Sequence, residues 1–111
     1  MLKIEQEVSR GIMFLRLNGM LNNNSFKRLG NEINHLLYKL GFQYFVIDFN
    51  EINIEDNMYL NIQNKLVEIF LNCGQVVLCG IKDVDKNKIG YTKDKLFYVN
   101  KESEAFRYLW M

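Results

Sequence analysis

Proline is absent from the sequence, and histidine occurs once and cysteine twice among its 111 residues. The two cysteines, Cys73 and Cys79, are too few to form a disulfide framework or a four-ligand zinc site by themselves. Because their spacing is not that of a C-x-x-C redox motif, we expect small buried thiols. The chain also lacks a linker rich in proline and serine, and its length predicts one domain over residues 1–111.

An excess of either charge is missing as well, since 14 Lys and Arg residues face 13 Asp and Glu residues, for a net charge of +1. This balance gives no electrostatic reason to expect nucleic acid or an anionic membrane as a partner. The longest apolar runs have about five or six residues, against roughly 20 needed to span a bilayer. With no apolar signal region at the start, we expect a cytoplasmic protein.

The sequence also offers little for catalysis. Its one histidine, His35, lies within a predicted helix, and no serine or cysteine has the G-x-S-x-G context of a nucleophile. Its glycines form no phosphate-binding loop. Four acids fall at and after the end of a predicted central strand: Asp48, Glu51, Glu55 and Asp56. A receiver or metal site would need further acids where Asn18 and Gly19 stand. We therefore predict a protein that is not an enzyme and needs neither a metal nor a cofactor.

What the sequence does contain is a regular alternation of strand and helix patterns. A hairpin turning near residues 9–11 opens the chain, and its second strand is predicted to end at the turn signal Asn18-Gly19. Apolar stripes at three- and four-residue steps predict the helices, with Gly41 and Gly74 ending the first two. The expected strands are 2–8, 12–17, 44–49, 75–81 and 96–99, and the expected helices are 26–40, 58–73 and 101–110, with a weak fourth helix over 82–95.

This order of elements defines the expected fold class. Strands that alternate with helices imply right-handed βαβ units, and hence a largely parallel sheet with helices packed against it. The continuous apolar run at residues 44–49 predicts a central strand that is buried on both faces. We therefore expect an α/β domain with a mixed, largely parallel sheet of about four to five strands and about three to four helices, the first strand lying antiparallel at an edge.

Several motifs, in the same order, resemble those of STAS domains, the fold of bacterial anti-sigma factor antagonists. Residues 12–22 resemble the L-x-G-x-L-D opening of the family, and residues 45–49 resemble its V-V-L-D-L strand. Residues 54–60 stand where the family has F-[IM]-D-S-S-G-L, and residues 74–80 are similar to the strand after its second helix. The resemblance covers residues 9–110 and implies a single-domain STAS-like fold.

The resemblance also implies a function. In the family, the second serine of D-S-S-G-L is phosphorylated by a partner kinase, an anti-sigma factor, and the unmodified domain binds that kinase to free a sigma factor. Here Asp56 matches the aspartate, Asn57 the first serine, Met58 the phosphorylated serine and Tyr59 the glycine. Methionine has no hydroxyl, so the switch cannot operate at this position. The implied protein is a non-enzymatic regulator that binds an anti-sigma-factor-like kinase or another regulatory protein.

The expected partner-binding face lies where the second strand and the central strand end, because both loops leave the same edge of a parallel sheet. The N-terminus of the second helix exposes N–H groups there. Met58 and Tyr59 would add an adaptable apolar anchor and an amphipathic ring. The alternatives are a first core residue of the helix for Met58 and an ordinary surface tyrosine for Tyr59. The face comprises Asn22, Asn23, Asn24, Ser25, Asp56, Asn57, Met58 and Tyr59.

Other functions stay open at this point. STAS-like domains also occur in membrane transport systems, so a subunit or regulator of such a system is the main alternative. A small ligand-binding or enzymatic domain is the third possibility. The hydroxyl of Ser25, within the expected face, would be the place for a relocated phosphorylation switch.

Overall fold

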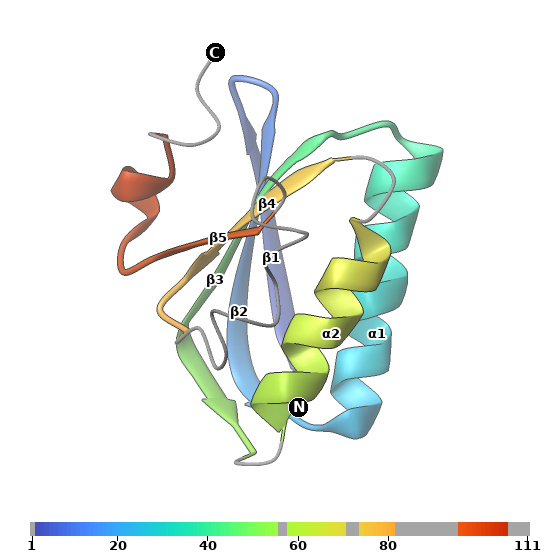
Figure 1. Ribbon diagram of the computed structural model, residues 1–111, viewed down its shortest axis with the longest axis vertical. Helices are drawn as coiled ribbons and strands as arrows, with labels where there is room; N and C mark the ends of the chain where they lie inside the picture. Colours follow the sequence, from blue (N-terminus) through green and yellow to red (C-terminus); the bar gives the residue numbers. More distant parts are fainter. Residues whose placement is uncertain (1, 56–57, 71–73, 82–95, 107–111) are drawn as a thin grey trace.

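The computed structural model describes residues 2–55, 58–70, 74–81 and 96–106, which form one sheet with two α-helices on one side (Figure 1). The five strands follow one another across the sheet in chain order. They are β1 (Lys3–Ser9), β2 (Ile12–Leu21), β3 (Tyr44–Ile54), β4 (Gln75–Cys79) and β5 (Leu96–Val99). The helical elements are α1 (Asn23–Asn34), the π-helical turn η1 (His35–Lys39), α2 (Tyr59–Ile69) and the 3-10 turn η4 (Glu102–Ala105).

The topology confirms the expected α/β class with a largely parallel sheet. β1 pairs antiparallel with β2, and every other neighbouring pair of these strands is parallel. α1 and α2 lie side by side on one face of the sheet, and η4 lies on the other (Figure 1). Each α-helix is a crossover that returns the chain to the amino end of the next parallel strand.

The described residues contain two α-helices, where the sequence pattern predicted three to four. The weak helix predicted over 82–95 lies outside the described residues. The helix predicted over 101–110 is, as far as it is described, the short turn η4. The Lys101 N–H donates to the Glu104 carboxylate at 3.1 Å and closes this turn. This turn buries Ala105 against the sheet, and residues 107–110 of the predicted helix lie outside the described residues.

β3 is the centre of the sheet and is buried on both faces, as its continuous apolar run predicted. Toward the helices, Phe45 is fully buried and packs edge-on against Phe70 after α2, with the ring centroids 5.3 Å apart. Toward the other face, Val46 belongs to a smaller apolar cluster that η4 covers. That cluster consists of Ile12, Phe14, Val46, Val77, Cys79 and Ala105.

β2 and β3 both run further than their sequence patterns predicted. Asn18-Gly19 is not a turn but lies inside β2, where the register against β3 shifts after Arg16. Gly19 has a φ of +111° but stays paired with Ile52, and the extra residue that shifts the register lies on β3 between Asp48 and Glu51. The paired strands end only at Leu21 and Ile54, so both following helices begin beyond the same edge of the sheet.

Candidate functional site

β2 and β3 end side by side at the edge of the sheet from which both helices start. Leu21 pairs with Ile54, and the N–H of Glu55 donates to the Leu21 carbonyl at 3.4 Å. Figure 1 shows the N-terminal ends of α1 and α2 next to each other at this end of the sheet. The structure thus brings together the two loops that carry the face expected from the sequence, and we call this region the carboxyl edge.

A capping box fixes the start of α1 at the carboxyl edge. The Asn22 side-chain oxygen accepts from the Ser25 N–H at 3.0 Å, and the Ser25 hydroxyl oxygen accepts from the Asn22 N–H at 2.9 Å. The Ser25 hydroxyl in turn donates to the Met20 carbonyl at 3.0 Å. Asn22 and Ser25 therefore have structural roles, whereas the side chains of Asn23 and Asn24 are exposed beside them.

Met58 corrects one prediction made from the sequence. Its side chain is 1 % exposed and belongs to the main core, as does Ile62 one turn later in α2. The Met58 N–H donates to the Glu55 carbonyl at 2.9 Å in the tight turn that precedes the helix. The prediction of an exposed apolar anchor at Met58 is wrong, because this residue, the N-cap of α2, lies on the core-facing side of the helix start.

The start of α2 presents backbone N–H groups that have no acceptor within the helix itself. Asp56, Asn57 and the side chain of Tyr59 lie outside the described residues, although Tyr59 is the first residue of α2. Among the described residues, no side chain caps this helix, and its first turn holds no acidic residue.

A polar groove between α1 and α2 continues from the carboxyl edge. Amides and lysines make up most of its lining, and Lys65 lies 3.7 Å from Glu68 at one side. The sequence analysis missed this groove because it depends on how two helices pack, and the only available signal was the polar outer stripe of each. The groove is lined by Asn23, Phe26 and Lys27 from α1 and by Asn61, Asn64 and Lys65 from α2.

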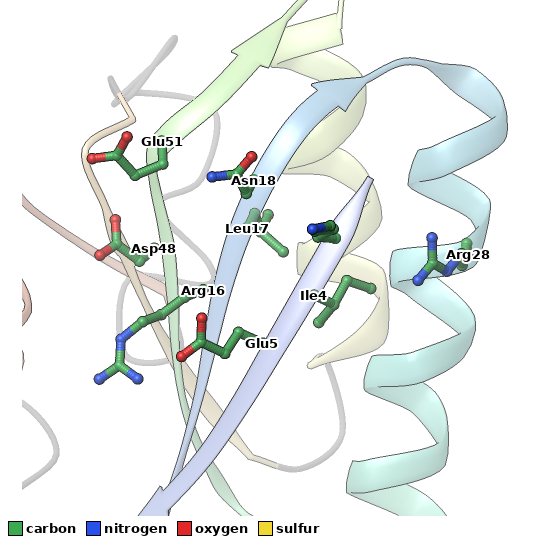
Figure 2. Close-up of a pocket in the computed structure, with 9 residues that line it drawn as sticks. Ile4, Glu5, Arg16, Leu17, Asn18, Arg28, Asp48 and Glu51 are labelled. Carbon is green, nitrogen blue, oxygen red and sulfur yellow. The ribbon is translucent and has the colours of Figure 1, made fainter. Parts of the chain in front are cut away.

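A second cluster lies on the face of the sheet away from α1 and is centred on Arg16 (Figure 2). The Arg16 guanidinium donates to both carboxylate oxygens of Glu102 at 2.9 Å and to Glu7 at 2.6 Å. These hydrogen bonds raise the pKa of Arg16 further above its ordinary value. Because the two-pronged contact joins β2 to η4, the pair Arg16–Glu102 is a clamp that holds η4 on the sheet.

Asp48 of β3 points to the same side of the sheet as this clamp (Figure 2). Burial alone would raise the pKa of Asp48. Hydrogen bonds from the Asn50 N–H and side-chain amide at 2.9 and 2.8 Å, together with the charge of Arg16, act in the other direction. Their combined effect holds the pKa of Asp48 below its ordinary value, so the ionised carboxylate is the form that the fold prefers.

We expect Asp48→Asn to lower stability at neutral pH and to lose this effect in acid. Since the folded-state pKa of Asp48 lies below the unfolded value of about 3.9, its ionised form stabilises the fold at pH values above about 4. That stabilisation is lost as the pH falls through the folded-state pKa. Urea unfolding should show a wild-type advantage at about pH 7 that becomes smaller as the pH is lowered below about 4.

The control for this prediction is Glu51→Gln. Glu51 is an exposed carboxylate on the same strand and forms no ion pair within the described residues. This variant should follow the wild type over the same pH range. An equal loss of stability in Asp48→Asn across that range would contradict the role given to the Asp48 charge.

Two groups that could support nucleophilic chemistry, Cys79 and His35, lie in the part of the chain that the structure describes. Burial raises the pKa of the Cys79 thiol to about 12, helped by nearby carboxylates, so its thiolate is not available. Cys79 is buried, as expected, and Cys73 lies outside the described residues. His35 is exposed at the far end of α1 from the carboxyl edge. Within the described ranges, no three His, Cys, Asp or Glu side chains are grouped as metal ligands.

The length and hydropathy of a helix determine whether it could cross a membrane. No helix in the part of the chain that the structure describes is long and apolar enough to cross a membrane.

Comparisons of the sequence find no relatives, whereas solved structures with a similar fold are found. No family model matches the sequence, and no curated protein matches it. An anti-sigma factor antagonist structure, SpoIIAA in its unphosphorylated form, matches with a TM-score of 0.63 and 14% identity, covering 92% of each chain. Bacillus SpoIIAA in its phosphorylated form matches with a TM-score of 0.62 and 15% identity, covering 95% of this chain and 97% of that one.

A third solved structure supports the same fold. It is a Thermotoga maritima protein assigned as an anti-sigma factor antagonist, with a TM-score of 0.68 and 15% identity over 94% of this chain and 92% of that one. The chain therefore has a STAS-like fold along nearly its whole length, as the sequence resemblance implied.

Proposed function

We propose that this protein is a non-enzymatic regulatory module that binds a protein partner through the carboxyl edge. The observation that carries the proposal is the likeness over more than nine-tenths of the chain to anti-sigma factor antagonists. The kind of partner that fits this likeness is an anti-sigma-factor-like kinase or another regulatory protein of the cytoplasm.

The chemistry of the carboxyl edge supports recognition by shape and hydrogen bonds. Asn23 and Asn24 expose neutral amides at the first turn of α1, where N–H groups also lack intrahelical acceptors. We place Asp56, Asn57 and Tyr59 in the same face, together with the start of the groove between α1 and α2. A chain with a net charge of +1 has little long-range field, so short-range contacts would decide its specificity.

We further propose that this module is not switched by phosphorylation. The position that matches the phosphorylated serine holds Met58, which has no hydroxyl and is buried. The nearest hydroxyl on α1, that of Ser25, takes part in the capping box and donates to a backbone carbonyl. Mass spectrometry after incubation with the kinase and ATP should find no phosphate at residues 57–59 or at Ser25; phosphate at any of them would overturn this part.

The binding proposal is tested by two matched substitutions on one helix. Asn24 lies in the first turn of α1 at the carboxyl edge, and Asn31 lies about two turns further along; both are exposed. Asn24→Arg should weaken binding of a purified anti-sigma-factor-like kinase by about tenfold or more in calorimetry, since it adds bulk and charge to a central contact. Asn31→Arg should bind like the wild type.

Two results would overturn this assignment. If Asn24→Arg binds as tightly as the wild type while Asn31→Arg does not, the partner-binding face lies elsewhere on α1. If neither the wild type nor the variants bind such kinases, but the wild type binds a component of a transport system, the alternative named from the sequence replaces the kinase-like partner.

A further inference from the structure

The outer side of β1 is an open edge of the sheet. β1 is the first strand in the sheet order, and no other described strand pairs with its outer side. Its turn to β2 is the two-residue loop Arg10-Gly11, with φ values of 54° and 79°, between the paired residues Ser9 and Ile12. The predicted hairpin is therefore present, and its turn has the positive φ values that such tight hairpins require.

This hairpin geometry determines which backbone groups of β1 are free. In a two-residue hairpin the pair next to the turn exchanges hydrogen bonds, and bonded pairs then alternate along the ladder. Counting from Ser9, the N–H and C=O groups of odd-numbered residues point to β2. The N–H and C=O groups of Ile4, Gln6 and Val8 point outward, where they could hydrogen-bond with one more strand.

The side chains leave this edge accessible. Glu5, Gln6 and Glu7 are exposed, and Val8 is 52 % exposed, which is unusual for an apolar residue of a strand. Gln6 contacts the neighbouring helix α1, where its amide donates to Glu32 at 2.6 Å, and leaves the outer side of the strand open. An extended segment could therefore reach the three outward N–H and C=O pairs.

The charged side chains of β1 determine which kind of strand could pair with its outer edge. Glu5 and Glu7 lie on the same face, the one away from α1, and Figure 2 shows Glu5 there beside the sheet. A second copy paired antiparallel around Gln6 would place Glu5 opposite Glu7 twice, and like charges across a ladder repel. A strand with lysine or arginine at those positions would instead pair favourably with Glu5 and would share Glu7 with Arg16, which already donates to it at 2.6 Å.

We propose that the outer edge of β1 binds an extended segment of a protein partner that carries basic residues at alternate positions, with apolar residues between them. The basic residues face Glu5 and Glu7, and the apolar ones lie beside Ile4 and Val8. This edge is separate from the carboxyl edge, so the proposal stands on the ladder and the charges of β1 alone.

The probe is a short peptide of alternating lysine and valine, blocked at both ends, and the control is the same peptide with glutamate for lysine. Nuclear magnetic resonance should show saturable shifts and slowed exchange at the amides of Ile4, Gln6 and Val8 with the lysine peptide. Binding should weaken as salt is raised, because exposed ion pairs are screened. Equal binding of the glutamate peptide, or shifts confined to other elements, would overturn the proposal.

Two substitutions of Gln6 distinguish the contribution of its backbone N–H to peptide binding from the contribution of its side chain. Gln6→Pro removes an outward N–H that takes no part in the pairing with β2, and proline is tolerated at such edge positions. Gln6→Ala keeps that N–H and removes only the contact with Glu32. We expect about fivefold weaker peptide binding for Gln6→Pro and a change below about twofold for Gln6→Ala.

A charge reversal keeps the test decisive even if Gln6→Pro does not fold. Glu5→Lys should prefer the glutamate peptide over the lysine peptide, because Glu5 is exposed and forms no ion pair within the described residues. Unchanged peptide preference in this variant would contradict the assigned partner chemistry. A dimer in sedimentation that Gln6→Pro dissociates would show a second copy on this edge and would likewise overturn it.

Discussion

Replacement of Met58 by aspartate is expected to unfold the protein or to lower its free energy of unfolding by about 4 kcal/mol or more. The Met58 side chain is 1 % exposed and shares the main core with Ile62 and Leu66. A carboxylate in that place must either stay ionised without water or take up a proton, and both cost free energy. A domain of this size is stable by only about 5–15 kcal/mol, so the loss is a large part of the total.

Guanidinium unfolding followed by circular dichroism measures this effect, with two controls on the same helix. Met58→Leu keeps an apolar side chain of similar volume and should cost about 1.5 kcal/mol or less. Asn61→Asp places a new carboxylate on the exposed side of α2 and should change stability by about 0.5 kcal/mol or less. A Met58→Asp variant with nearly wild-type stability would show that this side chain is exposed after all.

This prediction also bears on the proposed function. Met58 stands at the position that, by resemblance, matches the phosphorylated serine of the antagonists. A negative charge there would act on the core of the protein and not on an exposed binding surface. An aspartate that imitates phosphorylation is therefore expected to abolish partner binding through unfolding, and the loss of binding should track the unfolded fraction.

Phe45→Ala is the second substitution with a large expected effect, at about 3–5 kcal/mol of lost stability. Phe45 is fully buried in the central strand β3, where its ring meets that of Phe70 at 5.3 Å. The truncation removes apolar contact with the helical layer and leaves a cavity, and it also removes the edge-to-face ring contact. The surrounding sheet is held by parallel pairing on both sides of β3, so it can collapse only partly.

The same unfolding measurement tests this prediction, with Leu40→Ala as the matched truncation. Leu40 is 57 % exposed after the π-helical turn, so its removal should cost about 0.5 kcal/mol or less. If the two truncations have similar costs, Phe45 is not a central packing residue and the description of the main core is incorrect.

Several features of the molecule could be predicted from the sequence because their causes are local. The run at residues 44–49 is apolar except for Asp48, and this favours a strand covered on both sides. The capping box of Asn22 and Ser25 spans only three residues, so a polar stretch before an apolar stripe was enough to indicate where α1 begins. The tight turn near Ser9 likewise depends on adjacent residues.

Other features depended on partners far along the chain, and for these the local signal was misleading or missing. Asn18-Gly19 has turn chemistry, but pairing with Glu51 and Ile52 of β3 carries β2 through it as a strand. The Arg16–Glu102 clamp joins residues 86 positions apart, and no local pattern marks it. The groove between α1 and α2 exists only once the two helices pack.

The sequence by itself determined the alternation of strands and helices, the central strand and the edge at which both helices begin, because hydrophobic period and capping act over a few residues. Only the tertiary structure shows where the Met58 side chain lies, since an apolar residue at a helix start can face either a partner or the core. Packing of α2 on the sheet turned it inward. The edge position of β1 was predicted from the sequence, and the tertiary structure added which of its backbone groups face outward.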